Sequence, residues 1–382
     1  MGVKAKIIAM YFTQLHTIPE NDEWWGKGFT DWDNVRRAKP LFDGHYQPRI
    51  TLNSNYYDQS KIETIRGQVE LAKRFGIYGF CHYHYWFDGK QLLETPTNIF
   101  LQNADIDFPF CLSWANETWS KRWDGRDHDI LIKQTHPPTE ESWSNHFDYL
   151  IKAWSDKRAI KIDGKPVFVI YRPQKIEKID AMLAFWNKKA IDSGLKGVYF
   201  IFQKPCEPSD KSCLNSFDAE FQFQPFEAIN SHTYSYGAAN KQRVRYLIEG
   251  LPKFVQNFIW SLRAASKKNY TVHHYDKVWQ QIIENNVTTV PNVFPGAFVD
   301  WDNTARYGNR ATIFVGASPE RFKFWFQKLI DTVSTRHPEN NYIFLNAWNE
   351  WAEGAYIEPD EKYGNAYLEA IQDVLSRQVS GN

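Results

Sequence analysis

The sequence predicts an α/β protein with a (β/α)8 TIM barrel, in which parallel strands alternate with helices around a closed ring. Three observations predict this fold. Eight short apolar segments are spread along the 382 residues. Amphipathic segments with helical periodicity lie between them. No linker rich in Pro, Ser or Gly, no charge block and no fixed-period repeat divides the chain. A barrel of this length can form one domain, so we expect a single catalytic domain over residues 1–382.

The expected strands are runs of apolar, β-branched and aromatic residues that end at polar or turn-forming residues. In chain order they are Lys6–Phe12, Ile77–Trp86, Phe108–Trp114, Lys165–Tyr171, Gly197–Gln203, Ala219–Phe223, Val290–Phe298 and Tyr342–Trp348.

The stretches between the strands predict helices. In Asp58–Phe75, the apolar residues Ile62, Ile65, Val69 and Ala72 recur at the spacing of one helix face. The same periodicity predicts helices at Ile176–Ser193, Lys241–Ala265, Pro319–Thr335 and Tyr363–Arg377. The segment Thr13–Asn55 after the first strand is longer than an ordinary strand–helix connection, which indicates a functional loop.

Composition excludes several classes of partner. The chain has 45 Lys and Arg residues and 45 Asp and Glu residues, so its formal net charge is zero. This balance provides no overall field that attracts nucleic acid or anionic lipid, and we expect neither as a partner. The 4 cysteines form no C-x-x-C pair and no zinc-finger spacing.

The sequence also predicts a compartment. No run of about 18 apolar residues occurs, so no membrane span is expected. The N-terminal residues lack the apolar core and cleavage site of a signal peptide. These features predict a cytoplasmic protein for the chain as given, or a periplasmic or secreted one if a signal has been removed.

The ends of the predicted strands indicate the ligand, because a barrel of this type carries its active site at the carboxyl ends of its strands. Nearly every end places an aromatic residue beside a polar one, as in Tyr171-Arg172 and Trp301-Asp302-Asn303. Aromatic faces stack on the C–H faces of sugar rings, while amides and charged groups bond the hydroxyls. We therefore expect an oligosaccharide or polysaccharide substrate. The alternative is that the aromatic residues only fill the barrel and its rim.

The expected substrate contacts come from these strand ends and from the loop after the first strand. They are Tyr11, Gln14, His16, Trp24, Trp25, His82, Tyr83, Tyr85, Trp86, Trp114, Asn116, Glu117, Tyr171, Arg172, Gln203, Trp301, Asp302, Asn303, Trp348 and Asn349.

The sharpest feature is the segment Asn346–Pro359, which follows the last strand and contains Glu350 and Glu353. Their spacing of three would bring both carboxyl groups onto one face of a helical turn. When two carboxyl groups lie so close, ionising both costs additional free energy, so the pKa of one should rise. That difference separates an acid from a base, as glycoside hydrolysis requires. The alternative, a solvated helix face, is disfavoured by the neighbouring Trp348 and Trp351.

The segment Asn349-Glu350-Trp351-x-Glu353-Gly354-x-x-Ile357-Glu358-Pro359 resembles the signature of glycoside hydrolase family 99, the endo-α-mannosidases. The chain as a whole is more similar to the WbsX-like proteins of bacterial polysaccharide loci, which are labelled glycosyltransferases. Matching stretches are Trp24–Trp32, Trp114–Trp119 and Trp301–Thr304.

The resemblance to family 99 implies a retaining (β/α)8 glycosidase with no cofactor. It implies that Glu350 deprotonates the 2-hydroxyl of the sugar, whose oxygen then attacks its own anomeric carbon to form a 1,2-anhydro sugar. Glu353 would protonate the leaving oxygen and later activate water. The 2-hydroxyl must then lie trans to the leaving group, as in α-mannosides and α-rhamnosides.

Three further sequence features, the two histidines, Glu117 and Arg172, each have an alternative interpretation. His82 and His84 share one face of a predicted strand, and His-x-His can bind zinc, although no further ligands are evident and we expect no metal. Glu117 is either a further acid or the partner of Lys121 or Arg122 in a loop ion pair. Arg172 binds either a sugar group or one of the carboxylates.

Short Asp-x-Asp patterns such as Asp31–Asp33 occur in nucleotide-sugar transferases, but no phosphate-binding glycine motif accompanies them. Asp302, Asn303 and Arg306 are either sugar contacts or structure at the rim. A glycosyltransferase of surface polysaccharide biosynthesis and a non-catalytic carbohydrate-binding barrel therefore remain as the alternative functions.

Overall fold

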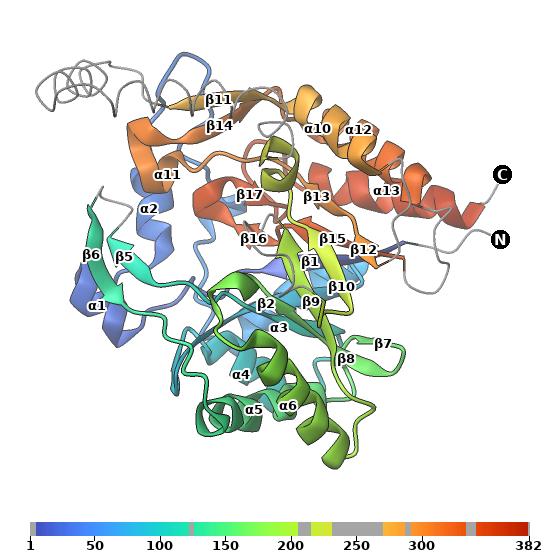
Figure 1. The fold of residues 1–382 in the computed structure, drawn as a ribbon. Coiled ribbons are helices and arrows are strands. Elements are labelled where there is room, and N and C mark those ends of the chain that lie inside the picture. Colours follow the sequence, from blue (N-terminus) through green and yellow to red (C-terminus); the bar gives the residue numbers. More distant parts are fainter. Residues whose placement is uncertain are drawn as a thin grey trace, which may run out of the picture.

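The computed structural model describes residues 5–121, 126–204, 215–230, 270–286, 292–333 and 341–380. Its centre is an 11-stranded sheet, of which nine strands follow one another through parallel pairing (Figure 1). In chain order these nine are β1 (Lys6–Tyr11), β2 (Gly79–Phe87), β4 (Phe110–Trp114), β8 (Lys165–Ile170), β9 (Tyr199–Lys204), β10 (Ala219–Gln222), β12 (Val293–Phe294), β13 (Gly296–Phe298) and β15 (Tyr342–Asn346).

The sheet closes on itself through one short segment. Only Pro295 separates β12 from β13. Val293 in β12 pairs with Glu220 in β10, and Ala297 in β13 pairs with Leu345 in β15. One segment therefore joins both ends of the sheet and gives a barrel with eight strand positions. The predicted (β/α)8 fold is confirmed, and each expected strand overlaps an observed one.

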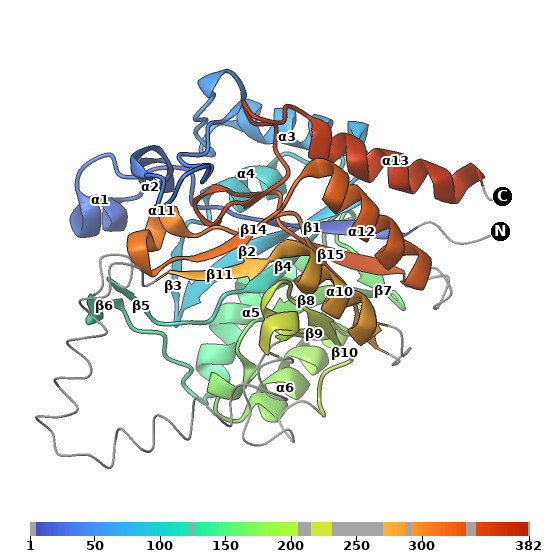
Figure 2. The ribbon, with the colours of Figure 1, turned by 90° about the horizontal axis from the view of Figure 1, so that it is seen from above.

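Helices cover the outside of the barrel (Figure 2). They are α3 (Ile62–Arg74), α4 (Thr95–Gln102), α5 (Glu140–Trp154), α6 (Ile179–Asp192), α10 (Tyr275–Asn286), α12 (Pro319–Val333) and α13 (Ala366–Ser380). Four of the expected helices correspond to α3, α6, α12 and α13. The fifth, Lys241–Ala265, lies outside the described residues.

The periodicity analysis missed α5. Thr139 caps this helix by accepting a hydrogen bond from the backbone of Ser142 at 3.3 Å. Its buried face includes Trp143 and His146, which are aromatic and polar rather than aliphatic. Phe147 and Leu150 lie on the same face, so an apolar pattern was present in the sequence and was overlooked.

The side chains of the strands alternate between two clusters, as the period of two requires. Ile8, Met10 and Cys81 belong to the cluster inside the barrel, together with Val169 and Ile201. The intervening side chains of the same strands point outward and form a larger core with the helices. This alternation decides which strand-end residues reach the mouth of the barrel.

The long loop after β1 packs across the carboxyl ends of the strands. It contains α1 (Pro19–Trp25), α2 (Asp31–Arg37) and the short 3₁₀ turn η1 (Leu52–Ser54). Trp32 from α2 packs against Phe12, Ala305 and Trp351 in a separate apolar cluster. In the part of the chain that the structure describes, no helix is long and apolar enough to cross a membrane.

Shorter elements complete the mouth and the surface. They are β3 (Lys90–Leu92), β5 (Trp119–Lys121), β6 (Arg126–Ile132), β7 (Lys161–Ile162), β11 (Thr271–His274), β14 (Thr312–Val315), β16 (Asn349–Glu350), β17 (Ala355–Tyr356), α11 (Thr304–Tyr307), η3 (Pro173–Lys175), η5 (Gly308–Arg310) and η6 (Trp351–Glu353).

Candidate active site

The guanidinium of Arg306 gathers three carboxylates at the carboxyl end of the barrel. Its Nη1 lies 2.9 Å from Oε1 of Glu353. Its Nη2 lies 3.0 Å from Oε1 of Glu350 and 2.5 Å from Oδ2 of Asp31. These side chains come from α11, from the turn after β15 and from α2. The two glutamates therefore converge on a single planar group, although they belong to a 3₁₀ turn and its preceding strand rather than to one α-helix.

The turn that carries both glutamates is held by its neighbours. Gly354 adopts a positive φ of 65°, and a Cβ at this position would lie 3.0 Å from the backbone nitrogen of Asp302. That nitrogen donates a hydrogen bond to the backbone oxygen of Glu353 at 2.7 Å. The amide side chain of Asn349 bonds both the backbone nitrogen and the oxygen of Phe12, at 2.8 and 3.0 Å. The turn is thus tied to β1 and to the loop after β13.

Glu358 anchors the aromatic residues of the same segment. Its buried carboxylate accepts hydrogen bonds from Tyr57, Gln68, Trp348 and Trp351 at 2.6 to 2.9 Å. Burial raises the pKa of Glu358, and these four donors act against the rise. Trp348 is fully buried, so this tryptophan supports the turn from below.

Burial also raises the pKa of Glu350 well above its ordinary value and raises that of Glu353, while Arg306 opposes both shifts. The sequence analysis expected mutual repulsion to be the cause, and burial is the larger one. The side chain of Glu353 is 20% exposed, whereas that of Glu350 is 8% exposed. Glu353 is therefore the more accessible carboxylate of the pair.

Three tyrosines surround the pair. The charges of Glu350 and Glu353 act on the half-buried Tyr83, and the charge of Glu353 acts on Tyr171. Tyr85 feels the charge of Glu350 and accepts a hydrogen bond from Nε2 of Gln14 at 3.0 Å. These residues were predicted from the strand ends, and the structure brings them to one place.

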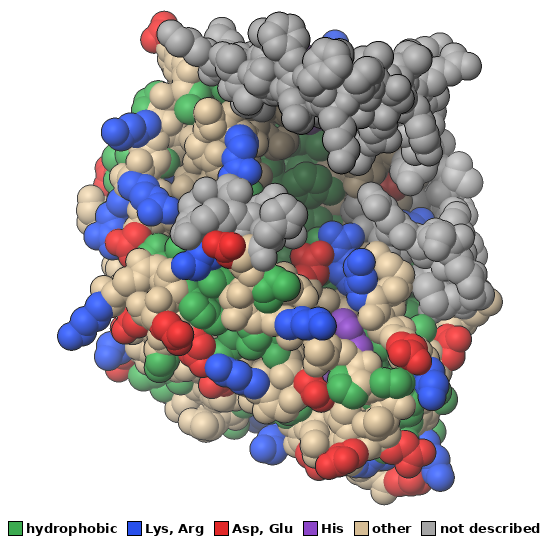
Figure 3. All heavy atoms as spheres, turned by 60° about the vertical axis from the view of Figure 1, so that its left-hand side comes forward, with side chains coloured by type: hydrophobic (Ala, Val, Ile, Leu, Met, Phe, Trp, Pro, Cys, Tyr) green, Lys and Arg blue, Asp and Glu red, His purple; other side chains and the backbone are tan. Residues whose placement is uncertain are grey.

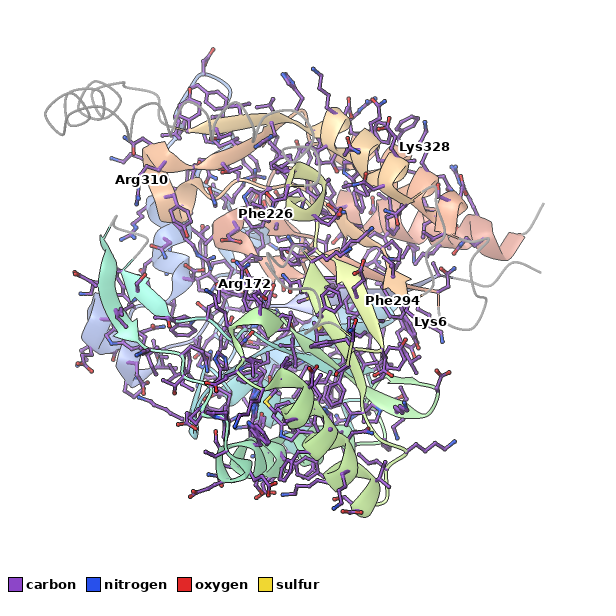
Figure 4. The ribbon with its side chains drawn as sticks, in the orientation of Figure 1. Lys6, Arg172, Phe226, Phe294, Arg310 and Lys328 are labelled. Atoms are coloured by element: carbon purple, nitrogen blue, oxygen red, sulfur yellow. The ribbon has the colours of Figure 1, made fainter. Side chains whose placement is uncertain are left out.

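An ion pair forms part of the rim beside Tyr171. Nε of Arg172 lies 2.8 Å from Oε1 of Glu117, and Nη2 donates to the hydroxyl of Tyr171 at 2.8 Å. Glu117 thus pairs with Arg172 rather than with Lys121. The ion-pair partner of Arg172 is Glu117 and not one of the two glutamates Glu350 and Glu353. Burial raises the pKa of Tyr171 to about 12, and the charge of Glu117 adds to the rise. In Figure 4, Arg172 lies toward the carboxyl ends of the strands, whereas Lys6 lies at the opposite side.

A cleft of about 220 Å³ opens beside this cluster. On this face hydrophobic side chains lie between basic and acidic ones (Figure 3). The rings of Trp24 and Trp119 meet edge to face at 6.1 Å, which forms an aromatic wall between α1 and β5. The residues lining the cleft are Gln14, Asn21, Trp24, Trp25, Glu117, Thr118, Trp119, Ser120, Leu131, Arg306 and Tyr307.

Several predicted contact residues point away from the mouth, into the layer between the barrel and the helices. The hydroxyl of Tyr11 donates to Gln68 in α3 at 2.6 Å. Nε2 of His84 lies 2.8 Å from Nε2 of His146 in α5. The strand face shared by the two histidines was correctly predicted, but it faces the helices. The outward set comprises Tyr11, His82, His84, Trp86, Trp114, Trp301 and Trp348.

Other predicted residues form hydrogen bonds that fix the loops at the rim, and they do not line the cleft. The amide of Asn116 bonds the backbone nitrogen and oxygen of Arg172 at 2.7 and 2.9 Å. Asn303 accepts from the backbone of Thr312 at 2.7 Å. Asp302 accepts from His45, Gln47 and Thr304, which ties the loop after β1 to the rim. His16 and Gln203 are buried, each 2% exposed, and do not line the described cleft.

Sequence reasoning missed two members of the cluster. Asp31 entered only as part of an Asp-x-Asp pattern and of the matching stretch Trp24–Trp32, and Arg306 only as a sugar contact or rim residue. Both are joined to the glutamates by contacts between distant segments, which no local spacing reveals. Within the described ranges, no group of three or more His, Cys, Asp or Glu side chains is arranged to hold a metal ion.

Comparison with known proteins gives a family and a fold. The family model described as Glycosyltransferase WbsX matches residues 7–371. The protein WxcX of Xanthomonas campestris pv. campestris strain B100 is 34% identical over 375 residues, which cover 98% of this chain and 50% of that protein. The WxcX protein of strain ATCC 33913 gives the same identity and coverage. The chain thus spans about half the length of these curated relatives.

Solved structures share the fold at low sequence identity. The GH99 endo-alpha-mannosidase from Bacteroides thetaiotaomicron is similar with a TM-score of 0.53 and 12% identity, over 98% of this chain and 97% of that chain. A structure described as a glycoside hydrolase-like protein gives a TM-score of 0.57 and 13% identity, over 98% and 94%.

Proposed function

The chain belongs to the WbsX glycosyltransferase family, and from this premise and the arrangement around Arg306 we propose that the protein is a glycoside hydrolase acting with retention. One observation carries the proposal. Two carboxylates, each within 3.0 Å of the same guanidinium, lie where the strands of a (β/α)8 barrel end. Glycoside cleavage requires such a pair, in which one group donates a proton while the other accepts one or attacks.

The two glutamates have different roles in this proposal. Glu353 is the acid and base toward the leaving oxygen and water, because its side chain is the more exposed of the pair. Glu350 is the base toward the sugar, as the resemblance to family 99 implies, and its side chain is the less exposed of the pair. Arg306 holds both groups in position during the reaction.

The route follows from the resemblance to family 99. Glu350 takes the proton of the 2-hydroxyl, and the oxygen forms a bond to its own anomeric carbon. The bond from that carbon to the leaving oxygen breaks at the same time, and Glu353 protonates the leaving oxygen. Water, deprotonated by Glu353, then opens the 1,2-anhydro sugar, and Glu350 returns the proton to the 2-hydroxyl oxygen. Two inversions at the anomeric carbon give retention.

The proposed substrate is a 1,2-trans glycoside of the α-mannoside or α-rhamnoside type, within an oligosaccharide or polysaccharide. The cleft beside Arg306 supports this class, because Trp24 and Trp119 offer aromatic faces while Gln14 and Glu117 offer polar groups. The proposed contact set therefore comprises the cleft residues and the three tyrosines. It leaves out the predicted residues that face the helices.

A glycosyltransferase is the second candidate, and the description of the family favours it. A sugar hydroxyl could meet the same intermediate in place of water. The two candidates differ in donor, because a transferase of surface polysaccharide biosynthesis would use a nucleotide sugar.

The test incubates the protein with α-mannosyl and α-rhamnosyl oligosaccharides, with EDTA and without nucleotide sugar, and identifies products by mass spectrometry. Cleavage by the wild type and none by Glu353→Gln is the expected result. Turnover of a nucleotide sugar that EDTA abolishes would instead establish the transferase. Sugar binding without turnover of any donor would indicate a non-catalytic barrel.

A further inference from the structure

Asp31 shares one nitrogen of Arg306 with Glu350. Nη2 lies 2.5 Å from Oδ2 of Asp31 and 3.0 Å from Oε1 of Glu350, so Asp31 has the closer contact. The other oxygen of Asp31 accepts a hydrogen bond from Nδ2 of Asn34 at 2.7 Å. The side chain is 2% exposed. Asp31 is therefore a buried, well-bonded carboxylate that reaches the glutamates only through Arg306.

The charges in this cluster do not balance when every group is ionised. Three carboxylates and one guanidinium leave two net negative charges, and burying them without compensation is costly. The neighbouring hydroxyls of Tyr83, Tyr85 and Tyr171 supply no positive charge, and burial raises the pKa of each. Among the described residues, the charges that act on Glu350 are those of Arg306, Glu353 and Asp31. Within that part of the chain, a bound proton is the available compensation.

The location of that proton follows from the contacts. Asp31 contacts Arg306 and has a second donor in Asn34, so two separate donors hold its carboxylate. Glu350 has only a share of the same nitrogen, and Glu353 has the other nitrogen. The proton therefore belongs to the glutamate pair.

We propose that Asp31 is a positioning residue that keeps one proton on the Glu350–Glu353 pair at neutral pH. It does so by engaging Nη2 of Arg306 and by adding a negative charge to the cluster. The pair then contains one acid and one base before the sugar binds. This inference rests on the proposed function for its purpose, but the proton it assigns exists without substrate.

The test is a carboxyl titration of the substrate-free protein by ¹³C NMR, with glutamate side chains labelled and signals assigned through Glu350→Gln and Glu353→Gln. In the wild type, the pair should retain one proton at pH 7. In Asp31→Asn, an isosteric change that keeps an acceptor for Arg306, removal of the charge should lower both pKa values by about one unit or more. Both glutamates should then be ionised at pH 7.

Matched variants separate this role from a structural one. Asp31→Glu should restore the proton, and Asp33→Asn should leave the titration unchanged, because Asp33 on the same helix bonds the backbone of Thr30 instead. The Asn variant could have a melting temperature below that of the assay. In that case Asp31→Ser provides a second variant with a neutral side chain. Both neutral variants should move the acidic and basic limbs of the profile of kcat/KM against pH to lower pH.

Two results would overturn the inference: a wild-type pair without a proton at pH 7, or a pair whose titration is the same in both neutral variants. The titration does not need a substrate. If the glutamate titration changes as expected in the neutral Asp31 variants while the wild type cleaves no glycoside, the role of Asp31 holds and the proposed function fails. If glycosides are cleaved and the titration is unaffected, the inference alone fails.

Discussion

Nη1 of Arg306 lies 2.9 Å from Oε1 of Glu353, so the proposed acid is held by a side chain from α11 and not by its own turn alone. The backbone oxygen of Glu353 is bonded at the same time by the backbone of Asp302. Position and protonation of the acid therefore depend on the segment that follows β13. The first prediction tests the acid itself.

Glu353→Gln should lower kcat for oligosaccharides by about 10²- to 10⁴-fold, because the leaving oxygen loses its proton donor. Aryl glycosides with good leaving groups should lose much less in the first chemical step. Steady-state rates for both substrate classes check this, with Glu369→Gln on the exposed side of α13 as the control. Equal losses for the two classes would contradict the acid role of Glu353.

Glu350→Gln should stop the reaction while substrate binding is retained, because the amide cannot accept the proton of the 2-hydroxyl. Isothermal titration calorimetry with an uncleaved oligosaccharide would measure binding, and mass spectrometry would measure products. A 2-deoxy substrate should be inert with the wild type for the same reason. Rapid turnover of that substrate would rule out the 1,2-anhydro route.

Arg306→Met should destabilise the protein more at pH 8 than at pH 5. Without the guanidinium, the folded-state pKa values of Glu350 and Glu353 rise further above their unfolded values. The folded state is then favoured at low pH, where these groups are protonated, and that stability is lost as pH rises through the raised pKa values. We expect a loss of about 3 to 5 kcal/mol at pH 8 and a smaller one at pH 5.

Urea unfolding at the two pH values measures this difference. Arg321→Met is the control, because its ion pair with Asp276 is exposed on both sides and should contribute little to stability. A loss for Arg306→Met that is the same at both pH values would argue against a pH-dependent carboxylate cluster.

Glu358→Gln should lower the free energy of unfolding by about 2 to 4 kcal/mol. All four donors lose a charged acceptor, and two of them meet an amide NH2 group instead, because each carboxylate oxygen accepts two of the bonds. Enzymatic activity should fall as well, since Trp348 and Trp351 flank the turn that carries Glu350 and Glu353. Glu369→Gln, on the exposed side of α13, provides the control. An unchanged unfolding midpoint would show that Glu358 does not hold this segment.

Trp119→Ala should raise KM for oligosaccharides by roughly threefold to tenfold, since one aromatic contact contributes about 0.5 to 1.5 kcal/mol. Trp119→Phe should retain most of the binding. Trp143→Phe, in α5 and away from this cleft, controls for general effects of removing an indole. If KM is unchanged in Trp119→Ala, the substrate does not lie along this wall.

The fold was predictable because its signals are local. Apolar runs identified the strands, including Val290–Phe298, whose described part closes the barrel as β12 and β13. The pair Glu350 and Glu353 was also found locally, because three residues separate its members. The strand alternation placed His82 opposite Tyr83 correctly. It could not show which face would turn toward the helices, since that depends on the register of the whole barrel.

The remaining site residues depend on contacts between distant segments. Arg306 reaches Asp31 across the loop after β1, and neither residue has a neighbour in the sequence that predicts the meeting. Glu358 stood in the signature, but its role as an anchor depends on donors from three separate segments, which the sequence could not show to meet. Such contacts arise only when the barrel has brought its loops together, so the structure was needed to define the cluster.

The most direct test of the central claim is the anomeric configuration of the first product. An α-mannoside that the wild type cleaves would be followed by ¹H NMR at early times, before mutarotation, with Glu350→Gln in parallel. We expect the α-anomer to appear first with the wild type and no product to form with the variant. Initial formation of the β-anomer, or cleavage by the variant at the wild-type rate, would contradict that claim.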